Sequence, residues 1–182
     1  MPDFNTLLSC GDFRQGLVTG VIDIPQGSSH KIEWDRTTGL FRLDRVDPAI
    51  FAKPVNYGFI PQTLDEDGDE LDILCITGEP LPTGLAVEAR ILGVLNFRDG
   101  PDMDYKIVTV PADDRDTGNA LRTLEDVGQR WKDQVEHHFN HYKDFQAGTE
   151  TRVLGWAGIE EAIGIVAACS RRWQETQPPR HL

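Results

Sequence analysis

Residues 65–72, DEDGDELD, place six carboxylates in eight positions. Repulsion between carboxylates this close raises their pKa values and destabilises a fold, unless a positive charge lies among them. Gly68 separates Asp67 from Asp69, and its wide backbone freedom allows both carboxylates to turn toward a common centre. Asp72 lies in the apolar segment LDILCIT, where a carboxylate is costly to desolvate unless it is paired or binds a metal. The pattern predicts a cation site, whereas an acidic run alone is usually a solvated turn.

The donor types indicate which cation would suit this segment. Its side chains offer only oxygen ligands, without a neighbouring Cys or His, which favours Mg²⁺ or Mn²⁺ over Zn²⁺. An EF-hand calcium loop counted from Asp65 does not match, because Glu70 falls where glycine is needed and Ile76 falls where the bidentate glutamate is needed. A hard divalent ion other than calcium is therefore expected.

A second acidic cluster follows at 99–106, with the sequence DGPDMDYK. In an extended segment Asp104 and Lys106 share one face, because they are two positions apart. Alone, this cluster would be a surface turn with an ion pair of little energetic weight. Beside the first cluster it supplies enough oxygens to hold several Mg²⁺ ions. Such an arrangement activates water and stabilises both oxygens of a phosphoryl displacement.

Basic and phenolic side chains lie at the expected ends of strands and helices. Each of them alone is more often a surface residue than a ligand contact. Around an acidic metal centre, such a set would bind the outer oxygens of a highly charged phosphate and stabilise a transferring phosphoryl group. The set comprises Lys31 beside Glu33, Arg45 after Asp44, and Tyr142 and Lys143 in the stretch HYKD.

Composition and charge bound the class of protein. With 182 residues, of which 39% are hydrophobic, the chain can bury one sizeable core, so a single domain over 1–182 is expected. Its net charge of −12 would repel nucleic-acid backbones and anionic membranes, so neither is an expected partner. We find no stretch of the ~18 apolar residues that a membrane span needs, and no signal-peptide pattern. Three cysteines without CxxC spacing, Cys10, Cys75 and Cys169, fit a reducing cytoplasm.

The elements that must position these side chains are first strands and then helices. Short stretches rich in Val and Ile, separated by Gly, Pro and Asp turns, predict strands. Apolar residues recur at helical spacing from about 126 to 145, and a second helix is expected from about 159 to 173. We predict a mainly β (α+β) chain: an OB-like closed barrel of about five mainly antiparallel strands with two flanking C-terminal helices. The predicted strands cover 17–24, 31–34, 40–45, 71–77, 87–97 and 106–110.

The two helices carry more detailed expectations. In the first, Asp126 and Gln129 resemble a capping box. In the second, Ile159 is expected to point inward. The tail from about 174 to 182 is polar and holds two prolines, so we expect it to be frayed. The other inward positions are Trp131, Val135, Phe139 and Tyr142 in the first helix, and Ile163 and Val166 in the second.

Two histidines of the first expected helix could form a second kind of metal site, separate from the acidic clusters. His137 and His141 are spaced i and i+4, so one helix face could present both to a transition metal. No HExxH pattern accompanies them. Solvated or subunit-contact residues are therefore the favoured interpretation.

Six ordered blocks of the sequence resemble the soluble inorganic pyrophosphatases of the Mg²⁺-dependent, barrel-fold class. The resemblance runs from about Val18 to Arg172, and its most specific block, DGDELD, matches the family's D-G-D-x-x-D signature in register. It implies hydrolysis of pyrophosphate to two orthophosphates without a covalent enzyme intermediate, and a homo-oligomer, since bacterial relatives of this length assemble as hexamers. The other blocks are KIE at 31–33, GLFRLDR ending at Arg45, NYGFIPQTL from Asn56, the D-x4-D-x-K spacing from Asp99, and HYKD at 141–144.

The resemblance also implies a role for each matched residue. Asp69 looks like the general base that takes the proton from the attacking water. Glu33 is similar to an outer acidic residue that orders metal-bound waters. The ligands of Mg²⁺, or of Mn²⁺ as a substitute, would be Asp67, Asp72 and Asp104, with Asp99 for the ions that arrive with the substrate. The phosphates would be held by Lys31, Arg45, Tyr57, Lys106, Tyr142 and Lys143.

Three residues depart from the family pattern. Asp23 stands where the family usually has Glu, one methylene longer. Lys53 occupies a position usually filled by Tyr and adds charge near the phosphates. Gly100 follows Asp99 where an acidic residue is common. None of them removes a core metal ligand or the proposed base, so activity is expected, with Asp23 and Lys53 in outer positions of the site.

Two other classes of protein remain possible from the sequence. A non-catalytic module that binds single-stranded nucleic acid on an OB-like barrel would need a basic strand face with stacking aromatics, and the charge of −12 opposes it. A pseudoenzyme that retains the fold is left open by the three departures. Phosphate release that depends on Mg²⁺ would separate an enzyme from both.

Overall fold

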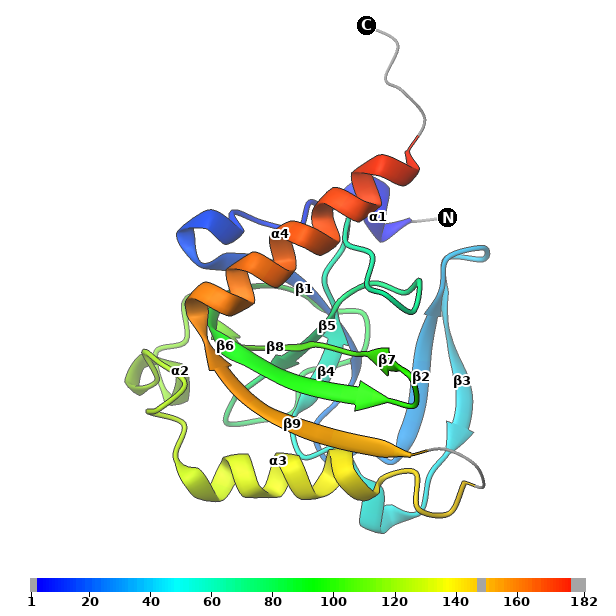
Figure 1. Ribbon diagram of the computed structural model, residues 1–182, viewed down its shortest axis with the longest axis vertical. Coiled ribbons are helices and arrows are strands. Elements are labelled where there is room, and N and C mark those ends of the chain that lie inside the picture. Colours follow the sequence, from blue (N-terminus) through cyan, green and yellow to red (C-terminus); the bar gives the residue numbers. More distant parts are fainter. Residues whose placement is uncertain (1–2, 147–149, 178–182) are drawn as a thin grey trace, which may run out of the picture.

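The structure is a computed structural model and describes residues 3–146 and 150–177. It is mainly β, with its two longest helices in the C-terminal third, as the sequence predicts (Figure 1). The strands are β1 Leu17–Ile24, β2 His30–Asp35, β3 Leu40–Val46, β4 Asn56–Phe59, β5 Asp72–Cys75, β6 Ala86–Asp99, β7 Asp102–Met103, β8 Lys106–Pro111 and β9 Thr151–Gly158. The helices are α1 Phe4–Leu7, α2 Thr117–Ala120, α3 Gln129–His141 and α4 Ile159–Thr176, with short 3-10 turns η1 Phe13–Gln15 and η2 Ala49–Phe51.

Hydrogen-bonded pairings connect five strands in a ring, in the order β1, β4, β5, β8, β6 and back to β1. All of these pairings are antiparallel except β5 with β8, which is parallel. The long strand β6 also pairs with β7 and β9. Strands β2 and β3 form a separate two-stranded hairpin that stands beside the main sheet (Figure 1). The hairpin can therefore supply a second wall to any site at this edge.

Strand β4 was not predicted, because glycine interrupts its apolar pattern. Gly58 is needed there for a close approach of two strands, since a Cβ at this position would lie 2.0 Å from the carbonyl oxygen of Val21 in β1. Strand β9 was also missed, and its sequence TRVLGWAG likewise contains glycines, which weaken a strand signal. Both segments form strands because they pair with neighbours in the large sheet, β4 with β1 and β9 with β6.

Strand β5 sits between two hydrophobic clusters, which explains its continuous apolar sequence. Successive side chains of a strand point to opposite faces. Ile73 accordingly packs in the cluster that contains Val166 of α4, whereas Leu74 packs in the cluster that contains Phe139 of α3. Both residues are fully buried. The prediction that LDILCIT is covered on both faces is confirmed.

The capping-box prediction for α3 is wrong. The helix begins at Gln129 after Gly128, and no side chain caps it. The Asp126 carboxylate instead accepts hydrogen bonds from the backbone N–H groups of Arg122 (2.9 Å) and Thr123 (2.8 Å). Asp126 therefore stabilises the turn that precedes the helix, because an Asx-type contact competes with capping.

Helix α4 differs from the prediction at both ends. Ile159, expected inside, is 41% exposed, because it occupies the first position of the helix at the rim of the sheet. The helix also continues to Thr176, three residues beyond the predicted end. The expected tail is thus shorter than predicted, and its residues 178–182 lie outside the described residues. In the described part of the chain, no helix is both long and apolar enough to cross a bilayer.

Candidate active site

A cavity of about 420 Å³ gathers the charged side chains that the sequence singled out. It lies between the β2–β3 hairpin, the acidic loop before β5 and the C-terminal end of α3. Lys106 is the one predicted site residue outside the lining. The predicted residues in the lining are Asp23, Lys31, Glu33, Arg45, Lys53, Tyr57, Asp67, Asp69, Asp72, Asp99, Asp104, Tyr142 and Lys143.

The acidic loop is shaped by its glycine. Gly68 has a φ of +93°, a conformation that other residues rarely adopt. Its turn is held by the backbone N–H of Asp65, which donates to the carbonyl of Asp69 at 2.7 Å, and by the Asp69 N–H, which donates to the Asp67 carboxylate at 3.0 Å. Asp67 and Asp69 therefore both reach the cavity, as the sequence predicts.

The positive charge beside Asp72 comes from Lys106. Strands β5 and β8 are parallel with Asp72 opposite Lys106, and Asp104 lies two residues before Lys106 on the same face. The Lys106 ammonium contacts both carboxylates and donates to the Tyr57 hydroxyl at 3.1 Å. Tyr57 also donates to Asp72. We call these four residues, Tyr57, Asp72, Asp104 and Lys106, the sheet wall.

Burial dominates the electrostatics of the sheet wall. Lys106 is 2% exposed, and burial alone would lower its pKa, but Asp104 and Asp72 together hold it well above the usual value. The pKa of Asp72 is raised to about 7, because burial outweighs the opposing effect of Lys106 and Asp104 adds repulsion. Burial, followed by the charge of Asp72, also raises the pKa of Asp23. In the sheet wall, two carboxylates thus share a single buried ammonium.

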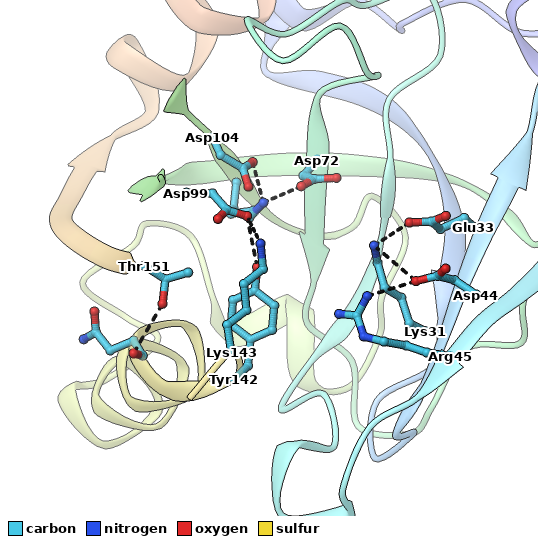
Figure 2. Close-up of polar contacts among 12 residues, drawn as sticks. Lys31, Glu33, Asp44, Arg45, Asp72, Asp99, Asp104, Tyr142, Lys143 and Thr151 are labelled. Atoms are coloured by element: carbon cyan, nitrogen blue, oxygen red, sulfur yellow. Dashed lines mark hydrogen bonds and ion pairs between the residues drawn. The ribbon is translucent and has the colours of Figure 1, made fainter. Parts of the chain in front are cut away.

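The opposite wall is formed by the β2–β3 hairpin and is much more open to water. Lys31 and Arg45 are directly opposite one another across the hairpin, which places both cations at the cavity. Lys31 contacts Glu33, and Arg45 pairs with Asp44 at 2.9 Å (Figure 2). We call these residues, Lys31, Glu33, Asp44 and Arg45, the hairpin wall.

A third group comes from the end of α3. Lys143 contacts Asp99, the last residue of β6, and the Tyr142 hydroxyl lies 3.4 Å from the same carboxylate (Figure 2). Burial raises the pKa of Tyr142, so its phenol stays protonated and can donate a hydrogen bond. The HYKD stretch is therefore brought to the cavity, as predicted.

Arg36 was missed by the sequence analysis. It follows β2, and its guanidinium pairs with Glu70 at 2.8 Å and with Asp69 at 3.3 Å. It also donates to the carbonyl of Gly68 at 3.1 Å. Arg36 thus ties the hairpin to the acidic loop, a contact between segments about thirty residues apart that no local pattern indicates. Glu70 and Asp65 also line the cavity, and their place in DEDGDELD was a usable signal.

Asp69 has a largely exposed side chain, with 83% of its surface accessible to water. The other carboxylates of residues 65–72 that form ion pairs in the described part of the chain are less exposed. Desolvation by the surrounding protein and the charge of Asp67 nevertheless raise its pKa. Arg36 acts in the opposite direction. Asp69 is therefore a carboxylate that faces the cavity water and is oriented by one guanidinium contact.

The donor set around the cavity fits a hard divalent ion, because it consists of carboxylate oxygens without sulfur. Asp23 Oδ1 is buried and has no hydrogen-bond partner, so it remains available as an acceptor. In residues 3–146 and 150–177, no three His, Cys, Asp or Glu side chains are grouped closely enough to hold an ion as they stand. Ammonium groups contact the carboxylates instead. The predicted convergence on one cavity is thus seen, while metal ligation stays a prediction.

His137 and His141 lie beside each other on α3, with ring centroids 4.6 Å apart. His141 Nδ1 lies 3.0 Å from the carboxylate of Asp144. Neither histidine is part of the cavity lining. The pair is therefore separate from the acidic site.

Comparisons with known proteins point to one family. The family described as "Inorganic pyrophosphatase" matches residues 20–174. An inorganic pyrophosphatase of Neisseria meningitidis serogroup A is 54% identical over 175 residues, which is 96% of this chain and 99% of that protein. One from Sulfolobus acidocaldarius is 40% identical over 91% of this chain and 96% of that protein.

Solved structures show the same similarity. The inorganic pyrophosphatase of Neisseria gonorrhoeae superposes with a TM-score of 0.92 at 55% identity, over 94% of this chain and 99% of that one. The enzyme from Thermus thermophilus gives 0.87 at 38% identity, over 92% of this chain and 97% of that one. The family match over 20–174 includes every residue of the cavity lining and all of α3.

Proposed function

The chain belongs to the inorganic pyrophosphatase family, and we propose that it hydrolyses inorganic pyrophosphate to two orthophosphates by direct attack of water. The observation that carries the proposal is the meeting of two acidic clusters and a set of cations and phenols in one cavity. Carboxylates suit metal ions, whereas Lys, Arg and Tyr suit phosphate oxygens. No covalent enzyme intermediate is needed.

Divalent cations, Mg²⁺ or Mn²⁺ in its place, are the proposed cofactors. Asp67, Asp72 and Asp104 would hold the ions at the attacked side, and Asp99 would bind those that arrive with the substrate. When bound, such ions lower the pKa of water and offset negative charge on the phosphates. Asp23 and Glu33 are proposed to lie in the outer ring of polar groups. The buried, unpartnered oxygen of Asp23 supports this, since it needs a donor or a cation.

Asp69 is the proposed general base. Its carboxylate is largely open to the cavity and is oriented by Arg36, whose Nη2 lies 3.3 Å away. It would accept the proton of the attacking water while the phosphoanhydride bond breaks, and the leaving phosphate would take the bridging oxygen. A positioned carboxylate of this kind contributes about 10²–10⁴-fold to the rate.

The remaining polar groups are proposed to hold the two phosphates. The cations would offset the charge that develops on the bridging and leaving oxygens, and the buried phenols would donate hydrogen bonds. Their arrangement on both walls of the cavity supports binding of two linked phosphate groups between them. The proposed phosphate contacts are Lys31, Arg45, Tyr57, Lys106, Tyr142 and Lys143.

The decisive experiment measures phosphate release from pyrophosphate by the purified protein, with Mg²⁺ and with a chelator. We expect release only with Mg²⁺. Asp69→Asn is expected to lower kcat by about a hundredfold or more while the melting temperature stays close to that of the unmodified protein, because the Asp69 side chain is 83% exposed. Absence of Mg²⁺-dependent hydrolysis in the unmodified protein would refute the proposed activity and favour a pseudoenzyme that retains the fold.

We further propose the finer features that the resemblance implies. The ring of pairings, closed by β1 with β6, supports an OB-like closed barrel in a single domain. Exposed apolar residues, Leu43 and Ile50 among them, support a homo-oligomer, with a hexamer expected from the resemblance. Three free, buried cysteines support a cytoplasmic location. Analytical ultracentrifugation tests the oligomer.

A further inference from the structure

Nearly every cation at the cavity is already matched by a carboxylate. An ion pair of this kind leaves little net positive charge for a ligand, since a phosphate must share the cation with its present partner. The pairs are Lys31 with Glu33, Arg36 with Glu70, Arg45 with Asp47, Lys106 with Asp72 and Lys143 with Asp99.

Lys53 is the exception. It lines the same cavity, yet its ammonium makes no hydrogen bond or ion pair within the described ranges 3–146 and 150–177. Its neighbours are aromatic: the nitrogen lies 4.7 Å from the ring centroid of Tyr57, 5.1 Å from that of Tyr142 and 5.6 Å from that of Phe139. We call these three rings the aromatic cage.

The aromatic cage holds the ammonium without neutralising it. Ring faces attract a cation through their quadrupole, but they carry no net charge. Backbone hydrogen bonds anchor the residue, because Lys53 N–H donates to Ser28 O at 2.9 Å and Gly27 N–H donates to Lys53 O at 2.8 Å. The ammonium is therefore held in place without a direct carboxylate contact in the described part of the chain. An ammonium withdrawn from water in this way is stabilised when an anion enters beside it.

Two of the cage rings belong to the proposed phosphate contacts. Tyr57 and Tyr142 each present a hydroxyl to the carboxylates of the site, Tyr57 to Asp72 and Tyr142 to Asp99. The Lys53 ammonium therefore lies near both phenols, Tyr57, which contacts β5, and Tyr142, which contacts the end of β6. A phosphate bound by these phenols would lie close to an unpaired positive charge.

We propose that Lys53 binds an anionic oxygen of the pyrophosphate substrate and of the orthophosphate product directly, and thereby sets the affinity of the cavity for phosphate. This inference rests on the proposed function, because it concerns the same cavity. Lys53 gives up no carboxylate when an anion binds, so its attraction is not offset by a lost ion pair. Its removal should weaken phosphate binding more than the loss of an equally distant paired cation.

Binding of inorganic phosphate, measured by titration calorimetry in Mg²⁺ buffer, tests the proposal without relying on turnover. Lys53→Met keeps an unbranched side chain in the aromatic cage but removes the charge. Loss of a charged hydrogen bond predicts that the Kd for phosphate rises about tenfold to a hundredfold. Lys132→Met is the matched control, because it makes the same chemical change on α3 outside the cavity, and its Kd should stay within about twofold.

Steady-state kinetics adds a second readout. Lys53→Met is expected to raise KM for pyrophosphate and the inhibition constant of inorganic phosphate together, with a smaller change in kcat. Lys53→Arg, which keeps the charge, should restore most of the phosphate affinity. A purely structural role would instead lower the melting temperature of Lys53→Met and leave Kd unchanged, and that result overturns the inference.

The outcomes separate this inference from the proposed function. If the unmodified protein hydrolyses pyrophosphate and Lys53→Met binds phosphate equally well, the inference fails and the function stands. If the unmodified protein binds phosphate but does not hydrolyse pyrophosphate, the function fails, and loss of binding in Lys53→Met still supports the inference. If the unmodified protein binds no phosphate, the inference fails, and the hydrolysis assay alone decides the function.

Discussion

The sheet wall and the hairpin wall use the same chemistry, ammonium or guanidinium beside carboxylate, in opposite surroundings. The Lys106 side chain is 2% exposed and Asp104 is 15% exposed. Across the cavity, the Lys31 side chain is 35% exposed and Glu33 is 53% exposed. The charges of the sheet wall are therefore mostly shielded from water, whereas those of the hairpin wall are in contact with it.

The difference determines what each wall contributes. An exposed ion pair contributes about 0–1 kcal/mol to stability, so the residues of the hairpin wall are open to change without loss of the fold. A buried ion pair adds little net stability, because desolvation of its charges is costly. Removal of one partner is strongly destabilising, because it leaves an unpaired charge in a low dielectric. The sheet wall therefore couples the proposed chemistry to folding, whereas the hairpin wall mainly serves binding.

Lys106→Met gives the largest expected effect on stability. It leaves the partly buried carboxylates of Asp72 and Asp104 without their shared ammonium, so we expect the free energy of unfolding, measured with urea in a chelating buffer, to fall by up to about 3–5 kcal/mol. Combining it with Asp72→Asn should cost less than the sum of the two single changes, because the unmatched charge is relieved. Unfolding of Lys106→Met at the same urea concentration as the unmodified protein would show that the buried lysine contributes no more to stability than an exposed one.

A buried group behind the site gives an intermediate effect that depends on pH. His138 is buried against Tyr142, and burial, followed by the charge of Lys53, lowers its pKa from 6.5 to about 3. The folded protein keeps His138 neutral, while the unfolded chain binds a proton near pH 6.5. The stability due to neutral His138 is therefore complete above about pH 6.5 and is lost as the pH falls toward 3, by about 1.4 kcal/mol per unit.

Comparison of two adjacent histidine variants measures this slope. His138→Gln should flatten the fall in unfolding free energy between pH 6 and pH 4, relative to the unmodified protein. His137→Gln is the control, because His137 is exposed on the same helix. Equal slopes for His138→Gln and the unmodified protein would show that burial does not hold this histidine neutral.

Lys31→Met gives the smallest expected change in stability, below about 1 kcal/mol, because its pairs with Glu33 and Asp44 are exposed. Its kcat/KM for pyrophosphate should nevertheless fall about tenfold to a hundredfold through loss of one charged phosphate contact. Urea unfolding and steady-state assays on the same preparation check both. A stability loss as large as that of Lys106→Met would show that the two walls do not differ as proposed.

Much of the site followed from local spacing. The D-G-D turn, the two-residue separation of Asp104 and Lys106, and the burial of both faces at LDILCIT were predicted from the sequence and are seen in the structure. These features depend on backbone geometry over a few residues, which a sequence displays directly. Strand β4 and the start of α3 were not predicted, because Gly58 and Asp126 take their roles from a neighbouring strand and a preceding turn.

The sequence by itself determined which residue types are available for the chemistry and in what order they occur. Only the tertiary structure decided which charges meet. The parallel register of β5 and β8 puts Lys106 beside Asp72, the hairpin brings Arg36 to Asp69, and three aromatic rings leave Lys53 without a carboxylate. The physical reason is that electrostatic energy depends on distance and burial, and both are set by contacts between segments far apart in the chain.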